Sequence, residues 1–322
     1  MPSSYELVNY SLRPAKAAER KMLCEIVRRL EPFSRIAAYR YVGFGSIYFA
    51  DFNLFHQNLG ISDMVSIEKD EANEDRFRFN RPFRCVNLVI GHSNTVLPTI
   101  AWDKRCFLWL DYDSKLNKSV LADIATVVSK VASGSLLVVT VNVQPERMPG
   151  AGPSKQDEYR LESLSGAVGY EKVPLGTTGA SLRSVALAKV CRKIMLNEIA
   201  KALTDRNGPL EDGSKLRFQQ VVHFLYADGA QMLTVGGVLY ENREESLAQA
   251  CGFHELSFVA KGEDAFTIRA PKLTQKEIRH VNSQLPRVPP DQLSLPGVPD
   301  SDVQDYAAIY RYYPSFSEVL LG

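Results

Sequence analysis

The sequence lacks the features that mark secreted, membrane-spanning or strongly nucleic-acid-binding proteins. Its 38 Lys and Arg against 37 Asp and Glu leave a formal net charge of +1, so any surface that attracts nucleic acid must be local. No run approaches the roughly 20 apolar residues that span a bilayer. Residues 1–10 also lack the basic-then-apolar order of a secretory signal. We therefore expect a soluble, cytoplasmic protein without a membrane partner.

Cysteine and histidine are scarce, with five of each. Neither residue type falls at the spacing of metal ligands, so we assign no metal. We predict reduced, mostly buried thiols at Cys24, Cys85, Cys106, Cys191 and Cys251. We expect structural roles for His56, His223, His254 and His280, and treat His92 separately below.

Apolar residues are plentiful: they make up 45% of the 322 residues, enough to bury a large core. Five segments are continuously apolar rather than alternating, which is typical of parallel strands buried on both faces. These segments are 37–42, 64–67, 86–90, 106–110 and 136–141. Helical patterns that end in glycine separate the first strand from the second and the fourth from the fifth. The order predicts an α/β fold with a doubly wound, mostly parallel sheet.

The C-terminal half of this predicted domain, which we place at 36–242, changes in character. Segment 143–178 has no sustained periodicity, and we interpret it as an inserted, partly mobile loop able to close over an acceptor site. A helix is predicted from 182 to about 203. Two strand-like runs then flank Asp228-Gly229, a strong hairpin signal. The sheet should therefore end in an antiparallel hairpin.

Two additions flank that domain. The N-terminal helical segment, 1–35, contains an amphipathic helix with a basic face at 13–30. The C-terminal extension, 243–322, contains a proline-rich irregular strap from 270 onward and then an aromatic tail.

A glycine turn follows the first predicted strand, in the order Gly43-Phe44-Gly45-Ser46. Glycine permits a tight turn and close approach of a ligand at the point where an open α/β sheet binds cofactors. About twenty residues later, Glu68 ends the second strand, where a carboxylate can accept hydrogen bonds from both hydroxyls of an adenosine ribose. Each feature alone has a simpler explanation, a steric turn or a solvated acid, but together they favour cofactor binding.

With these residues the chain resembles the class I S-adenosylmethionine-dependent methyltransferases over residues 36–240. The resemblance implies that the turn from Gly43 to Ser46 wraps the amino-acid part of the cofactor. It also implies that Glu68, with the adjacent Lys69, holds the ribose. The loop residues that would face the adenine are His92, Ser93 and Asn94. Two positions differ from the family pattern: Tyr41 replaces the usual acid before the first glycine, and Ile47 replaces the third glycine.

A nicotinamide dinucleotide fold is the alternative, because it too has a glycine turn followed by an acid. Its third glycine is replaced here by Tyr48, which would keep the helix from approaching the strand closely.

The fourth strand runs directly into Asp111-Tyr112-Asp113. The resemblance implies that these candidate catalytic residues face the methyl donor and the acceptor. Asp111 could hold the cofactor's amino group or orient an acceptor, and Asp113 could act as a general base if it is buried. The alternative for Asp113 is a capping role at a helix starting near Lys115.

The sequence does not identify the methyl acceptor. The Asp-Pro-Pro-Tyr signature of amino-directed DNA methyltransferases and the Pro-Cys nucleophile for cytosine are both missing, which leaves an oxygen acceptor or another nitrogen acceptor. The competing hypothesis is a non-catalytic nucleotide- or partner-binding module.

Two surfaces could bind a macromolecule. Four arginines alternate with three phenylalanines between the second and third strands, a composition suited to phosphates and stacked bases, though it also suits a solvated edge. These arginines are Arg76, Arg78, Arg81 and Arg84. The aromatic tail is the stronger candidate for contact with a protein partner, through Tyr310, Tyr312 and Tyr313.

Overall fold

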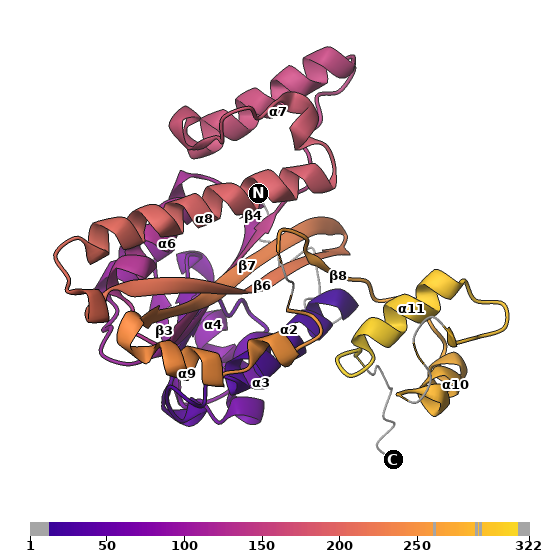
Figure 1. Ribbon diagram of the computed structural model, residues 1–322, viewed down its shortest axis with the longest axis horizontal. Helices are drawn as coiled ribbons and strands as arrows, with labels where there is room; N and C mark the ends of the chain where they lie inside the picture. The colour runs from indigo at the N-terminus through magenta and orange to yellow at the C-terminus, as the bar shows by residue number, and fades with distance from the viewer. Residues whose placement is uncertain (1–12, 260–261, 287–288, 290–291, 315–322) are drawn as a thin grey trace.

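A computed structural model describes residues 13–259, 262–286, 289 and 292–314, and its centre is one eight-stranded sheet (Figure 1). The strand order is β3-β2-β1-β4-β5-β7-β6-β8. The first five strands are parallel: β1 (Arg40–Gly43), β2 (Asp63–Glu68), β3 (Val86–Ile90), β4 (Cys106–Lys115) and β5 (Ser135–Asn142). The predicted doubly wound, mostly parallel sheet is therefore confirmed.

The sheet ends in the predicted antiparallel hairpin. Strands β6 (Leu216–Asp228) and β7 (Ala230–Glu241) pair with each other, and β7 also pairs antiparallel with β5. Gly229 closes the turn at φ 104°, a conformation that glycine adopts without steric cost. A three-residue strand, β8 (Phe266–Ile268), adds parallel to β6 and was not predicted.

Helices cover both faces of the sheet, and each face has its own apolar core (Figure 1). One face carries α2 (Pro14–Arg28), α3 (Ala50–Leu59) and α9 (Glu245–Ala250); the other carries α6 (Lys118–Lys130) and α8 (Val185–Asn207). Because side chains alternate along a strand, Phe107 and Trp109 of β4 join the first core, whereas Leu108 and Leu110 join the second. Two short helices, α4 (Glu74–Asn80) and α5 (Ser93–Val96), flank β3.

The predicted N-terminal amphipathic helix is confirmed as α2, but its basic face is not wholly exposed. Lys16 is 1% exposed and Arg20 is 7% exposed, because Lys16 pairs with Asp111 of β4 and Arg20 pairs with Asp51 of α3. These two cations are therefore unavailable to nucleic-acid phosphates.

Segment 143–178 is less irregular than predicted, since it contains the 16-residue helix α7 (Pro153–Val168). Within α7 only Leu164, Ser165 and Val168 are buried, so the sequence has no sustained apolar period. The helix lies on the outer side of α8, away from the sheet (Figure 1).

The prediction of an irregular proline-rich strap is wrong. The segment contains α10 (Gln275–Gln284) and α11 (Asp300–Ile309), which form a small lobe beside the sheet (Figure 1). A capping box starts α10: the N–H of Thr274 donates to Glu277 at 2.6 Å. This lobe has its own apolar cluster, which includes Val281 and Val303.

The aromatic tail packs largely within this chain. Tyr306 is buried, the Tyr312 ring lies 5.4 Å from that of Phe258, and the Tyr313 hydroxyl donates to the carbonyl of Pro271 at 2.6 Å. Phe316, the end of the predicted tail, lies outside the described residues.

Candidate active site

A cavity of about 740 Å³ opens at the carboxyl ends of β1, β2 and β4, and we call it the edge cavity. Its volume is in the range of small-molecule sites, and its position is where open α/β sheets bind ligands. Most predicted site residues line it: Phe44, Gly45, Ser46, Glu68, Lys69, His92, Ser93, Asp111, Tyr112 and Asp113. Gly43 and Asn94, also predicted, are not among the lining residues.

The glycine turn and Glu68 are joined directly. The backbone N–H of Gly45 donates to Glu68 Oε1 at 2.6 Å, and the hydroxyl of Ser66 donates to the same oxygen at 3.0 Å. Burial raises the pKa of Glu68 to about 7. A ligand that donates hydrogen bonds to this carboxylate would therefore also favour its charged form.

Close packing explains both glycines of the turn. A Cβ on Gly45 would lie 2.6 Å from the Phe49 ring and from Ser66 Oγ, and one on Gly43 would lie 2.4 Å from the Tyr41 hydroxyl. Gly43 thus accommodates Tyr41, which is fully buried among aromatic rings. Ser46 and Phe49 have left-handed backbone angles, φ 49° and 46°, a strained conformation found at many ligand sites.

The loop predicted to face the adenine is fixed by a buried acid on α6. Asp123 accepts hydrogen bonds from the Ser93 hydroxyl at 2.5 Å, from Asn94 Nδ2 at 2.6 Å and from the Tyr112 hydroxyl at 2.5 Å. Asn94 therefore supports the loop rather than lining the edge cavity. The Tyr112 ring packs edge-on against Phe44 at 5.1 Å, so these two rings form one wall. Asp123 was not predicted, because it lies within the apolar pattern of a helix.

The acids that end β4 differ from each other. Asp113 is exposed, which does not meet the condition we set for its role as a buried base. The alternative prediction, that Asp113 caps a helix starting near Lys115, is wrong, because β4 continues to Lys115. The residue that caps α6 is Asn117, which accepts hydrogen bonds from the N–H groups of Ser119 and Val120 at 2.9 and 3.1 Å. Asp111 is half-buried and engaged by α2.

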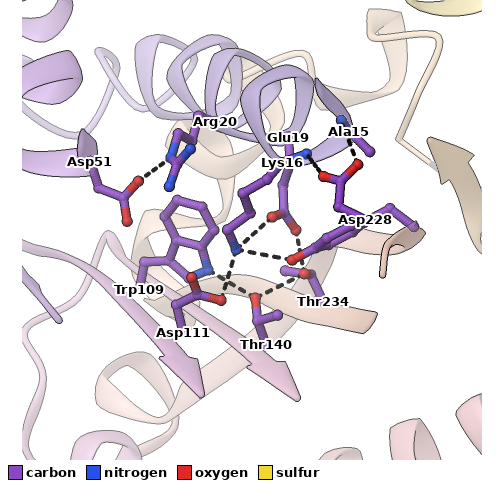
Figure 2. Close-up of polar contacts among 11 residues, drawn as sticks. Ala15, Lys16, Glu19, Arg20, Asp51, Trp109, Asp111, Thr140, Asp228 and Thr234 are labelled. Atoms are coloured by element: carbon purple, nitrogen blue, oxygen red, sulfur yellow. Dashed lines mark hydrogen bonds and ion pairs between the residues drawn. The ribbon is translucent and has the colours of Figure 1, made fainter. Parts of the chain in front are cut away.

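Lys16 extends from α2 toward the sheet and lies at the centre of a buried polar network (Figure 2). Its Nζ lies 2.7 Å from Asp111 Oδ1, 2.8 Å from Glu19 Oε2 and 3.1 Å from the Tyr226 hydroxyl. The same Nζ lies 4.1 Å from the centroid of the Trp109 ring. Burial alone would lower the pKa of Lys16, but the charges of Asp111 and Glu19 raise it, so the ammonium stays charged.

The network continues away from Lys16 in both directions. Trp109 Nε1 donates to Thr140 Oγ1 at 2.9 Å, and Thr140 bonds Thr234 at 2.8 Å, which in turn bonds Glu19 (Figure 2). At the start of α2, Asp228 accepts from the backbone N–H groups of Ala15 and Lys16 at 3.3 and 2.8 Å. The helix is thereby fixed to the sheet at both its backbone and its side chains.

Arg20 and Asp51 form a second buried ion pair, and both line the edge cavity (Figure 2). The sequence analysis did not assign either residue to the site; the only signal was that Lys16 and Arg20 lie four residues apart on one helix face. Carboxyl groups outnumber cations on the cavity wall. The acids are Asp51, Glu68, Asp70, Asp111 and Asp113, and the cations are Arg20 and Lys69.

Of the three phenylalanines in the predicted basic patch, only Phe79 is exposed. Phe77 is buried and lines the edge cavity, and Phe83 packs on His56 with ring centroids 4.3 Å apart. Phe79 is 89% exposed. Arg78 pairs with Glu74 on the same helix.

Within the described residues there is no group of three or more His, Cys, Asp or Glu side chains that could hold a metal ion. No described helix is both long and apolar enough to cross a membrane. Four of the five cysteines are buried free thiols, as predicted, and Cys85 is partly buried.

Comparison with known proteins gives one family and several distant structures. A family described as "Putative O-methyltransferase" matches residues 8–321. The curated protein sequences contain no match. Trm1 from Pyrococcus horikoshii, solved with S-adenosyl-L-methionine, aligns at 13% identity and a TM-score of 0.46, covering 76% of this chain and 60% of that chain.

Two further structures align at similar levels. The O-methyltransferase from Bacillus cereus, solved with SAH, has 13% identity and a TM-score of 0.39, covering 73% of this chain and 86% of that chain. A variant of LepI, solved with SAH and a substrate analogue, has 13% identity and a TM-score of 0.35, covering 62% of this chain. This chain spans 43% of LepI and 60% of Trm1, less than two thirds of either.

Proposed function

Because the chain belongs to the family described as "Putative O-methyltransferase" and has the class I methyltransferase fold, we propose that it transfers the methyl group of S-adenosylmethionine to an oxygen acceptor. The observation that carries the placement of the donor is the contact between Gly45 and Glu68, 2.6 Å long, at the mouth of the edge cavity. It brings a backbone turn and a ribose-binding carboxylate together where the sheet ends.

The donor fits the edge cavity by shape and by charge. Glu68 accepts from the ribose hydroxyls, and the adenine lies near His92 and Ser93, against the wall that Phe44 and Tyr112 form. The donor's sulfonium and ammonium groups are cations, and the excess of carboxyl groups on the cavity wall attracts them.

The methionine part of the donor lies toward α2. Asp111 accepts from the ammonium group while Lys16 holds the carboxylate of Asp111 in place. Arg20 lines the cavity and donates to the donor's carboxylate, because the planar guanidinium matches the two oxygens of a carboxylate.

Catalysis then rests on holding the acceptor oxygen in line with the methyl group and its sulfur. The new bond joins the methyl carbon to the acceptor oxygen as the carbon–sulfur bond breaks, and S-adenosylhomocysteine leaves. A hydroxyl acceptor also loses a proton. Asp113 lines the cavity and is exposed, so this part of the cavity is open to water, which takes up the proton.

Calorimetric titration with S-adenosylmethionine and S-adenosylhomocysteine tests the donor site. Both should bind, and Glu68→Ala should weaken binding by roughly 10- to 100-fold, the scale of losing a charged hydrogen-bond partner. Glu162→Ala, at an exposed position of α7, is the matched control and should bind as the unchanged protein does. If neither compound binds at millimolar concentration, the proposed function is wrong and the non-catalytic alternative gains support.

A further inference from the structure

A second cavity, of about 460 Å³, lies beyond the carboxyl end of β5, between the chain after that strand and α7. We call it the arginine cavity, because three arginines and three glutamines line it. They are Arg147, Arg160, Arg183, Gln144, Gln156 and Gln231. The proposed methyl transfer assigns no role to any of them.

The arginine cavity has an uncompensated positive charge. Asp157 pairs with both Arg160 and Arg183, with Oδ1 lying 2.9 Å from Arg160 Nη1 and from Arg183 Nε. Arg147 has no hydrogen bond or ion pair among the described residues. The residues that line the arginine cavity therefore include three guanidinium groups and neither Asp nor Glu, although the whole chain is nearly neutral at +1. Guanidinium groups match the two oxygens of a carboxylate or phosphate, so an anion suits this site.

The walls of the arginine cavity are fixed in place. Gln156 accepts from the N–H of Met148 at 2.9 Å and donates to the carbonyl of Glu146 at 3.1 Å, which fastens the chain after β5 to α7. On the other side, the backbone at Gly179 comes so close to α7 that a Cβ would lie 2.2 Å from the Asp157 carbonyl oxygen. This approach brings Arg183 to Asp157.

A third, smaller cavity of about 220 Å³ shares lining residues with each of the other two, and we call it the connecting cavity. It shares Gln144 and Arg160 with the arginine cavity and Asn117 with the edge cavity. Its walls are mainly apolar, with Leu116, Leu164, Leu182 and Leu187 among them. The three cavities thus follow one another along the carboxyl edge of the sheet.

We propose that the arginine cavity binds a carboxylate or phosphate group at the far end of an elongated acceptor. The acceptor's apolar middle lies in the connecting cavity, and its hydroxyl reaches the edge cavity. This inference rests on the proposed methyl transfer and adds the class of its substrate. Asn117 lines both the edge cavity and the connecting cavity, and Gln144 and Arg160 line both the connecting cavity and the arginine cavity, so an acceptor that spans the three cavities passes these residues.

Three probes of equal chain length test the proposal: 12-hydroxydodecanoate, 12-hydroxydodecyl phosphate and the neutral 12-hydroxydodecanamide. Their dissociation constants are measured by calorimetry on the unchanged protein and on the double variant Arg147→Gln with Arg183→Gln. Lys155→Gln, an exposed charge on α7 outside the arginine cavity, is the matched control.

We expect at least one anion to bind 10-fold or more tightly than the amide, and to lose that advantage in the double variant but not in the control. The anion that binds more tightly identifies the group. Equal binding of the amide, no binding of either anion, or no loss in the double variant would overturn the proposal. S-adenosylmethionine affinity is measured on the same samples. If S-adenosylmethionine does not bind, the proposed methyl transfer loses support. Anion binding is measured without the donor, so its result is independent of that outcome.

Discussion

The two ends of the carboxyl edge are built in opposite ways. Beside the edge cavity, a set of charged groups is buried and paired, Lys16 with Asp111 and Glu19 and Arg20 with Asp51, although Lys69 and Asp113 on its wall are exposed. Around the arginine cavity they are largely exposed, and Asp157 alone among the described carboxylates offsets the three arginines. Buried pairs fix a site that must hold one small donor in one orientation, whereas exposed arginines can attract an anion from solvent without a large desolvation cost.

The contrast is sharpest for Lys16, so replacing it should have the largest effect. Lys16→Met leaves Glu19 and Asp111 without their buried cation, and we expect a loss of about 3–5 kcal/mol in the free energy of unfolding. Urea denaturation measures it, with Lys155→Met on α7 as the exposed control. A loss equal to that of the control would show that the network contributes no stability.

The buried carboxyl group of Glu68, which we place in the donor site, should lower the stability of the folded protein at neutral pH. Its pKa is raised from 4.5 to about 7, so the folded protein keeps a proton that the unfolded chain releases. Stability therefore falls as pH rises from 4.5 through 7, by up to about 3 kcal/mol. Glu68→Gln removes this titration while its amide oxygen can still accept from Gly45. The variant should gain stability over the unchanged protein at pH 8 but not at pH 4.5, in paired urea titrations.

Tyr112 tests whether the wall of the edge cavity is structural. Its hydroxyl donates to Asp123, which keeps its bonds from Ser93 and Asn94 if the hydroxyl is removed. Tyr112→Phe should therefore cost about 1–2 kcal/mol of unfolding free energy and change donor affinity less than twofold. A large loss of S-adenosylmethionine binding in calorimetry would instead give the phenol a direct role in the site.

The features that the sequence could predict are those that depend on local patterns of residues. The five parallel strands, the hairpin and the residues of the first turn are apolar runs or glycines with fixed positions, and the structure confirms the fold they predicted. The resemblance to class I methyltransferases is confirmed by the family match. The roles of individual site residues stay predictions.

Long-range pairing could not be predicted. Lys16 and Asp111 lie 95 residues apart, and nothing in either local pattern indicates the other. The exposed helix α7 was missed for another reason: only three of its 16 residues are buried, so its apolar period is weak. The helices α10 and α11 of the C-terminal lobe were missed because the prolines between them dominate the pattern of that segment. Asp123 was missed because one acid in an apolar helix does not disturb the helical pattern.

The smallest expected effect on stability concerns Asp157, the acid of the arginine cavity. Its pairs with Arg160 and Arg183 are at the surface, and such pairs contribute little to folding. Asp157→Asn keeps the shape of the side chain, so the urea midpoint at pH 7 should not change. The same variant removes the carboxylate that these arginines share, which should strengthen binding of the 12-carbon anions about threefold. Binding of the neutral amide should stay constant, which separates charge from shape. Weaker anion binding in this variant would mean that Asp157 orients the arginines rather than competing with the ligand.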